Sequence, residues 1–430
     1  MIDVSWVGEI PSHWDVVPLK SKFSFSKGLS ITKADLVDTG CPVLSYGQIH
    51  SKNNAKTGIV GGLLRFVPDS ITDGCSESLA VKNGFIFADT SEDLDGCGNC
   101  NYIDQNGIYA GYHTVNLKPK TDEGWKYLGY LFQTDAWRYQ LRKELTEVKL
   151  YSISQKALKS TTILVPPRDE REAIVAFLDS KCTAIDDAIE RHKQIVEKLN
   201  MFLAETIANA TLHGTSSSEM KSSGVEWISQ IPESWNIKRG KYLFVETNER
   251  AVDGSEELLT VSQYTGITPR SQKNVNMFEA ESLVGYKICE VNDIPANTMW
   301  LWAGAIGVSS YRGLISPSYN IYRQIDNQYD NLYLDYLLRA TPLVQHYKAL
   351  STGIRPSRLR LYPDQFLNIK YPIPPMEEQK AIAAFLDDRK SKVEESISRQ
   401  TAAIEKLEEY RKSIIYQAVT GKIDCRKEAV

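Results

Sequence analysis

The segment VPPRDEREAIVAFLD at residues 165–179 returns at residues 373–387 as IPPMEEQKAIAAFLD, and this repeat is the main guide to the fold. A second pair of segments repeats in the same order. The block VSWVGEIPSHW at residues 4–14 recurs as VEWISQIPESW at residues 225–235, with both tryptophans and the proline in register. Two separate blocks that recur in one order are typical of an internal duplication. The sequence therefore predicts two copies of one plan.

Each Pro-Pro block opens a long helical pattern. Proline suits a first helical turn, and the acidic residues that follow it stabilise the positive end of the helix dipole. Apolar residues then recur at steps of three and four, as in a coiled coil. We expect helices from about residue 168 to His213-Gly214 and from about residue 376 to Gly421, each roughly 65 Å long at ~1.5 Å per residue. Their stripes comprise Leu178, Ile185, Ile189, His192, Val196, Leu199 and Leu203 in the first helix, and Leu386, Val393, Ile397, Gln400, Ile404 and Leu407 in the second.

The two helical stripes predict a mutual pairing, because neither helix can cover its apolar residues alone. His192 and Gln400 interrupt the stripes near the midpoint of each helix. If the helices pack antiparallel, these two side chains meet in one polar layer, which would fix the register. The polar stretch Thr215–Ser223 is interpreted as the linker between the copies.

The interiors of the two copies barely match, although both are rich in tyrosine, glycine and β-branched residues. Their patterns predict short strands and helices in an α+β arrangement. The expected fold is two tandem mixed α/β globules separated by two long helices that form an antiparallel coiled coil. The predicted domains are a globule at residues 1–165, a central helix at 166–214, a second globule at 215–372 and a C-terminal helix at 373–430. Expected strands are Gly84–Ala88, Tyr112–Leu117 and Tyr319–Arg323, and expected helices are Trp125–Leu141 and Tyr333–Leu350.

Composition limits the class of protein. The 430 residues are 42% hydrophobic and 24% charged, which is typical of a globular chain and excludes disorder as the main state. No secretory leader and no run of 18 apolar residues is seen, so no membrane span is expected. Seven scattered cysteines indicate reduced thiols and a cytoplasmic location. The net charge of −4 means that any nucleic-acid contact must come from local patches.

Two divergent globules, each introduced by an Ile-Pro-x-x-Trp block and closed by a Pro-Pro block that opens a long helix, resemble the DNA-specificity subunit of type I restriction-modification systems. Residues 42–49, 313–319 and 353–368 also look like that family. The resemblance implies target recognition domains that each read one half of a split, asymmetric site in double-stranded DNA. It further implies that the helices set the spacer and dock two methyltransferase (M) subunits, and that motor-nuclease (R) subunits join for cleavage.

Catalytic motifs are absent from the sequence. It contains no Gly-x-x-x-x-Gly-Lys-[Ser/Thr] phosphate loop, no Gly-x-Gly-x-x-Gly loop and no Asn/Asp-Pro-Pro-aromatic turn for methyl transfer to a base. We therefore expect a non-catalytic chain without cofactors, with S-adenosylmethionine, ATP and Mg²⁺ bound by partner subunits. Two alternatives are a self-contained restriction enzyme or methyltransferase fragment, and a coiled-coil scaffold without DNA readout.

The pair Cys97 and Cys100 has a metal-like spacing. Zinc requires four ligands, and no second Cys-x-x-Cys or histidine pair follows at a useful distance. A tight glycine turn is the favoured interpretation, and no metal site is predicted.

Readout of base pairs requires side chains that donate and accept hydrogen bonds at base edges. Aligning the copies places Gln48 opposite Gln263, so residues 45–52 and 260–270 are predicted contact loops, with a buried, turn-forming glutamine as the alternative. Trp300 and Trp302 are expected in the core, and Trp14 and Trp235 as structural pins. The predicted DNA contacts are Tyr46, Gln48, His50, Lys52, His113, Lys149, Tyr151, Ser154 and Lys156 in the first globule, and Gln263, Tyr264, Arg270, Tyr319, Asn320, Arg355, Arg358 and Arg360 in the second.

Overall fold

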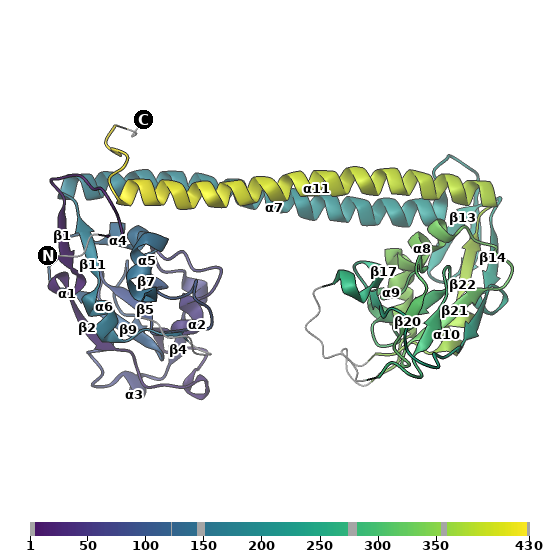
Figure 1. The fold of residues 1–430 in the computed structure, drawn as a ribbon, viewed down its shortest axis with the longest axis horizontal. Coiled ribbons are helices and arrows are strands. Elements are labelled where there is room, and N and C mark those ends of the chain that lie inside the picture. The colour runs from purple at the N-terminus through teal and green to yellow at the C-terminus, as the bar shows by residue number, and fades with distance from the viewer. Residues whose placement is uncertain (1–4, 122, 144–150, 274–281, 354–358, 428–430) are drawn as a thin grey trace. The chain divides into compact units, whose positions relative to one another are not determined.

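The fold is seen in a computed structural model that describes residues 5–121, 123–143, 151–273, 282–353 and 359–427 (Figure 1). The chain divides into two compact units: residues 1–191 with 403–430, and residues 192–402. Two long helices, α7 (Arg168–His213) and α11 (Met376–Val419), each contribute one part to both units. The predicted α+β fold with two long helices is confirmed, and their ends agree with the sequence pattern to within two residues.

The first unit is built on an antiparallel four-stranded sheet in the order β2-β9-β5-β7, beside a three-stranded sheet in the order β4-β3-β8. Aromatic side chains of the first sheet pack on helices α4 and α5, with the Phe85 and Phe132 ring centroids 5.0 Å apart. The elements are β1 (Asp15–Pro18), α1 (Leu19–Lys22), β2 (Phe23–Lys27), η1 (Lys33–Asp35), β3 (Cys41–Leu44), α2 (Tyr46–Ile49), η2 (Gly61–Leu63), β4 (Arg65–Val67), α3 (Asp69–Thr72), β5 (Phe85–Ala88), β6 (Thr90–Ser91), β7 (Cys100–Tyr102), β8 (Tyr109–Ala110), β9 (Thr114–Pro119), α4 (Lys126–Leu131), α5 (Asp135–Arg142), β10 (Tyr151–Ser152), α6 (Gln155–Ser160) and β11 (Thr162–Val165).

In its described residues the second unit has a three-stranded sheet in the order β15-β21-β19 and four two-stranded pairs. Phe366 lies at the centre of an aromatic core, with its ring centroid 4.3 Å from that of Tyr322. The elements are β12 (Met220–Val225), β13 (Ile228–Pro232), β14 (Asn236–Arg239), η3 (Gly240–Tyr242), β15 (Phe244–Thr247), β16 (Leu259–Ser262), β17 (Gly266–Pro269), η4 (Arg270–Gln272), β18 (Lys287–Cys289), β19 (Ile294–Ala296), η5 (Leu301–Ala303), β20 (Gly313–Ile315), β21 (Asn320–Gln324), α8 (Asn331–Arg339), α9 (Thr341–Leu350), α10 (Pro363–Asn368) and β22 (Lys370–Ile373).

The long helices pack antiparallel within each unit. In the first unit Asp186 of α7 accepts a hydrogen bond of 2.9 Å from Nε of Arg411, and Glu170, earlier on α7, lies 3.0 Å from Arg426, beyond the end of α11. In the second unit Nδ1 of His192 lies 2.6 Å from Oε1 of Gln400, as expected for two polar residues that meet in an antiparallel pair.

Burial of the apolar stripes varies along the helices. The stripe residues near the helix ends, such as Leu178 and Leu386, are fully buried. Val196, Leu199, Leu203, Ile397, Ile404 and Leu407, nearer the middle, are half-buried.

The repeated blocks form equivalent frames. Nε1 of Trp14 donates to Glu170 over 2.8 Å, and Nε1 of Trp235 donates to Glu378 over 3.0 Å, so each tryptophan ties its block to the first turn of a long helix. Both tryptophans are buried, as expected of residues that hold each block in place. The indole N–H thus finds the hydrogen-bond partner that a buried tryptophan needs. The same glutamate carboxylate stabilises the helix, because its negative charge lies at the positive end of the helix dipole.

The end of each long helix is marked by a glycine. Gly214 follows α7 with φ of 78°, and Gly421 lies just beyond α11 with φ of 70°. Residues with a β-carbon rarely adopt this conformation, whereas glycine does so without strain, which explains why the helices stop there. The second glycine also lies close to another part of the chain. An added β-carbon on Gly421 would come within 2.4 Å of Pro11.

Two expectations about secondary structure need correction. The predicted linker Thr215–Ser223 is wrong in its second half, because β12 begins at Met220 and pairs with β13. The helical segments at residues 125–141 and 333–350 are each broken in two. Thr134 caps α5 by accepting a hydrogen bond of 3.3 Å from the backbone N–H of Trp137, and Pro342 in the first turn of α9 prevents continuation of α8.

Membrane-spanning helices are not found in the described part of the chain, where no helix combines sufficient length with sufficient apolar character.

Candidate nucleic-acid interface

The predicted contact loop of the first unit forms a single helical turn, α2. The backbone N–H of Ser45 donates to Oε1 of Gln48 over 3.1 Å, which closes the turn at its N-terminus. Gln48 is half-buried, so its amide oxygen already has a structural use. The contact favours the turn-forming role for this residue. Lys52, which follows the turn, is exposed.

An aromatic cluster covers one side of this turn. The Tyr46 ring centroid lies 5.5 Å from those of both Tyr112 and His113, in edge-on geometry. His113 adopts a left-handed conformation with φ of 54° and lies 3.4 Å from Asp89. The side chain of His113 keeps 59% of its surface exposed, so it is accessible to a ligand.

Both ring nitrogens of His50 have partners inside the unit. Nε2 lies 2.8 Å from the carbonyl oxygen of Thr90, and Nδ1 lies 3.0 Å from the side-chain amide of Asn99. Asn99 in turn accepts a hydrogen bond of 2.8 Å from Nη2 of Arg138. The ring of His50 therefore orders the loop around residue 90, and a base contact would have to replace one of these bonds.

Strand β10 brings the last predicted group of the first unit to the same region, because Tyr151 pairs with Ser91 of β6. Ser154 caps α6 by accepting a hydrogen bond of 3.1 Å from the backbone N–H of Ala157, and Lys156 is exposed. Lys149 lies outside the described residues.

The corresponding loop of the second unit is a β-hairpin rather than a helical turn. Strands β16 and β17 pair from Leu259 to Ser262, and Gln263 and Tyr264 lie at the hairpin tip. Nη2 of Arg339 donates to the carbonyl oxygens of Gln263 and Tyr264 over 3.3 and 2.8 Å. Tyr264 keeps 82% of its surface exposed, so the braced tip presents an aromatic ring to solvent.

The remaining predicted contacts of the second unit differ in accessibility. Asn320 is buried and its side-chain amide donates to Glu246 over 3.0 Å, so it is poorly placed to contact a DNA base. Tyr319 beside it is half-buried. Arg270 is half-buried in η4, whereas Arg360 is exposed. Arg355 and Arg358 lie outside the described residues.

The expectation that Trp300 and Trp302 belong to the core is wrong. Trp300 keeps 48% of its surface exposed, and the two rings stack on each other at 5.6 Å between centroids with an interplanar angle of 25°. Nε1 of Trp302 donates to the carbonyl oxygen of Met299 over 2.9 Å. The two rings therefore cover part of each other's apolar surface, and the indole N–H of Trp302 is satisfied within the same turn, although neither ring lies in the core.

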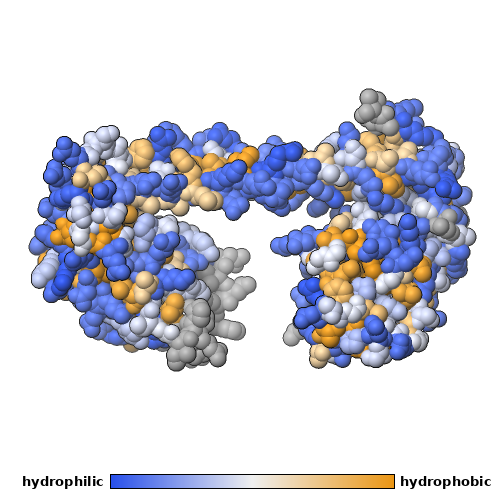
Figure 2. Space-filling model, turned by 180° about the vertical axis from the view of Figure 1, so that it is seen from behind, coloured by the Kyte–Doolittle hydropathy of each residue, from blue (hydrophilic) through white to orange (hydrophobic). Residues whose placement is uncertain are grey.

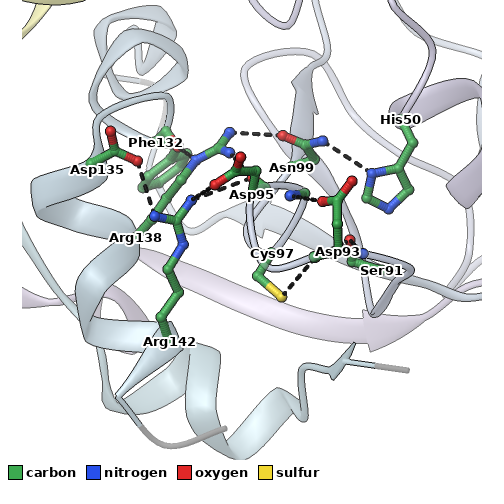
Figure 3. Close-up of polar contacts among 11 residues, drawn as sticks. His50, Ser91, Asp93, Asp95, Cys97, Asn99, Phe132, Asp135, Arg138 and Arg142 are labelled. Carbon is green, nitrogen blue, oxygen red and sulfur yellow. Dashed lines mark hydrogen bonds and ion pairs between the residues drawn. The ribbon is translucent and has the colours of Figure 1, made fainter. Parts of the chain in front are cut away.

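A pocket of about 1010 Å³ opens beside α2 in the first unit. Its walls come from three parts of that unit: the turn α2 with Lys56 in the loop after it, the loop after β6 with helix α5, and the last third of α11. Figure 3 shows the polar network on one wall, where Arg138 donates to the carbonyl oxygens of Phe132 and Asp95 and to Asn99. No sequence pattern pointed to this pocket, because its walls are distant in the chain.

Lys56 is a half-buried cation of the pocket that lies among other positive charges. Burial and the positive charges of Arg138, Arg411 and Lys412 lower the pKa of its ammonium from 10.5 to about 8. Its backbone adopts φ of 63°, a conformation that costs free energy for a residue with a β-carbon. The backbone is held there by two hydrogen bonds of 2.9 Å, from its N–H to Asn54 and from the N–H of Tyr102 to its carbonyl.

Cys97 and Cys100 lie in the glycine turn that the sequence favoured. Gly98 between them has φ of 89°, and both thiols are buried. Burial raises the pKa of Cys97 and raises that of Cys100 to about 12, so neither is a ready thiolate ligand. Across the described ranges, no three histidine, cysteine or acidic side chains gather as a metal site would require.

Comparison with known proteins assigns this architecture to a class. The family model described as the type I restriction modification DNA specificity domain matches twice, at residues 11–201 and 232–406, which together span most of the chain. The chain belongs to this family, and it is a type I restriction-modification specificity subunit with two tandem recognition domains.

Individual relatives agree over nearly the full length. The type I restriction enzyme MjaX specificity subunit of Methanocaldococcus jannaschii is 23% identical, with 97% of this chain and 95% of the relative covered. A chain solved in work on complex assembly and conformational transition of the type I R-M system has a TM-score of 0.72, at 15% identity over 96% of this chain and all of that one. The HsdS subunit from Thermoanaerobacter tengcongensis has a TM-score of 0.52, at 15% identity over 96% and 98% of the two chains. These structural likenesses show a shared fold.

Proposed function

We propose that the two globules read two unrelated half-sites of one asymmetric DNA site. The main support for this proposal is that the two globules share the strand pairs at which they begin and end but differ in the loops between them. In the first unit Asp15 pairs with Val165, and in the second unit Asn236 pairs with Ile373, so each globule begins and ends at an equivalent strand pair. Between these pairs the aligned loops differ, with a helical turn at Gln48 and a hairpin tip at Gln263. Different loops on one frame suit readers of different base sequences.

We infer that α7 and α11 dock the two methyltransferase subunits, for which a repeated frame offers equivalent surfaces. Large apolar side chains on α7 support this proposal: Ile195, Met201 and Phe202 keep 41%, 65% and 51% of their surfaces exposed. Ile195 and Phe202 are seven residues apart and therefore share a face of the helix. Figure 2 shows orange patches on the otherwise blue surface of the helices. Exposed apolar groups of this kind are typical of a surface that a partner covers.

Methyl transfer is assigned to the partner subunits, and cleavage to motor-nuclease subunits that join the complex. We expect the purified chain to bind neither S-adenosylmethionine nor ATP and to transfer no labelled methyl group to DNA. Mixing with the methyltransferase subunits should produce transfer to DNA that carries the recognised site. The assay follows radiolabel from S-adenosylmethionine into DNA, with each component alone as the control. Transfer by the purified chain would show that it is itself a catalyst.

We further propose that helix length sets the unspecified spacer between the half-sites. Inserting four residues into both helices, beside His192 and Gln400, lengthens each by about 6 Å and turns it by about 40°. The half-sites should stay the same while the spacer grows by one to two base pairs, at ~3.4 Å each. Methylome sequencing of cells with the insertion variant measures the spacer. An active complex that keeps the original spacer would refute this role for the helices.

A further inference from the structure

The pocket of the first unit holds three cations that have no carboxylate partner among its described residues. Lys56 and Lys412 take part in no side-chain ion pair or hydrogen bond there, and Arg138 bonds three neutral oxygens. The other two cations of the pocket are compensated, since Arg142 pairs with Asp135 over 3.0 Å and Arg411 pairs with Asp186 over 2.9 Å.

Carboxylates also line the pocket, but they do not neutralise Lys56. Asp135 is paired with Arg142, and Asp93 accepts a hydrogen bond of 2.6 Å from the backbone N–H of Gly96. Asp95 lies 3.8 Å from Arg142 and is almost fully exposed, as is typical of a rim position. Glu92, the fourth carboxylate of the lining, is also exposed. The charges that act on the Lys56 ammonium are chiefly those of Arg138, Arg411 and Lys412, and no pocket carboxylate offsets them.

Holding Lys56 in this place costs free energy, because its ammonium is half-buried among like charges and its backbone is strained. An anion bound at the pocket would reverse the electrostatic part of that cost. Uncompensated charge and backbone strain at one residue together are typical of a binding site rather than of a support for the fold.

We propose that Lys56, Arg138 and Lys412 bind a phosphodiester of the DNA backbone beside the first recognition loop. This inference rests on the proposed function and adds that helix α11, besides docking partners, supplies a cation to the DNA-binding surface of the first unit. Phosphate contacts of this kind set the position of a reader on the duplex without specifying sequence.

The surroundings favour DNA over an acidic peptide of a partner. Tyr46, Gly47 and His50 of the predicted base-contact loop form one wall of the same pocket. A backbone phosphate held there would lie next to the bases that this loop meets. Lysines without fixed partners also suit a phosphate, which accepts hydrogen bonds from many directions.

The test measures DNA binding by the assembled complex with its methyltransferase subunits at several salt concentrations. We expect the double variant K56Q/K412Q to bind several-fold more weakly, and the slope of log affinity against log salt to fall in magnitude by about 0.9 per lost phosphate contact. K406Q removes an exposed lysine from another face of α11 and serves as the control, with an unchanged slope. The methylated sequence should stay the same in both variants, because no base contact is removed.

The melting temperature of the K56Q complex provides a second test. It should rise if Lys56 is a binding residue and fall if Lys56 supports the fold. K56Q removes a repelled charge, so the free complex should melt about 2–4 °C higher. A lower melting temperature would show that Lys56 supports the fold and would overturn the assignment.

Other outcomes identify what would replace this proposal. Failure of K56Q/K412Q to assemble with methyltransferase subunits would point to an acidic peptide of the partner. Inhibition by tripolyphosphate that requires Lys56, with an unchanged salt slope on DNA, would point to a small free polyanion. An unchanged salt slope without such inhibition would show that the pocket has no role in binding. Absence of specific DNA binding by the unaltered complex would instead refute the proposed function itself.

Discussion

Exchanging residues 15–164 for the equivalent interior of another type I specificity subunit is expected to give a complex that methylates a hybrid site, with one new half and one unchanged half. The exchange is structurally mild because its ends lie on the paired strands β1 and β11, where the globule leaves and rejoins the frame. The incoming interior should carry the tyrosine equivalent to Tyr130, whose hydroxyl donates to Asp179 of α7 over 2.7 Å. Tyr336 and Asp387 make the corresponding contact in the second unit at 3.4 Å.

The reciprocal exchange of residues 236–372 is the matched control, and it should change only the other half-site. Methylome sequencing of cells that carry each chimaera with its partner subunits reads both halves at once. A single exchange that alters both half-sites would contradict modular reading. Loss of all methylation would be interpreted only after the chimaera is shown to assemble with methyltransferase subunits.

The variant W235A is expected to destabilise the second unit by about 3–5 kcal/mol, the usual cost of removing a buried tryptophan. Trp235 is fully buried, packs beside Gly214 and donates to Glu378 of α11. The variant therefore opens a cavity and also leaves a carboxylate without its donor. Unfolding in urea, followed by circular dichroism, measures the loss.

The matched control for this prediction is W300A, which removes the same side chain from an exposed position. Trp300 gains free energy mainly by stacking on Trp302, an interaction worth about 0.5–1.5 kcal/mol. Equal destabilisation by the two variants would contradict the assignment of Trp235 as the pin of its frame.

The frame could be predicted from the sequence because its determinants are local and repeated. The Pro-Pro blocks predict where α7 and α11 begin, and glycines predict where they end. For helices that pack antiparallel, the polar residues His192 and Gln400 near the two midpoints predict a shared polar layer, and the structure shows this contact.

The recognition loops could not be predicted, because their conformations depend on tertiary contacts. Gln48 and Gln263 align in sequence, yet one closes a helical turn and the other lies at a hairpin tip braced by Arg339. The pocket was missed for the same reason. Lys56 and Lys412 come from opposite ends of the chain and meet only when α11 packs against the first unit.

Equivalent positions of the two frames also differ in ways that sequence alone leaves open. Gln379 donates to the carbonyl oxygens of Gln328 and Pro374 over 3.0 and 2.9 Å and holds the approach to α11. Arg171, at the same position of α7, instead places its guanidinium over the Trp125 ring at 4.8 Å. In the first unit a cation above an aromatic ring therefore takes the place of the hydrogen-bonded amide of the second unit. Which contact forms depends on the residues that surround this position in each globule.

Methylome sequencing of cells that carry this chain with its methyltransferase subunits shows directly whether the two globules read DNA. We expect one asymmetric motif in two parts, with two unrelated half-sites separated by a spacer of fixed length and unspecified sequence. The motif should disappear when the gene for this chain is deleted while the methyltransferase genes remain. A continuous or palindromic motif, or methylation that persists without this chain, would contradict the claim that its two globules are the readers.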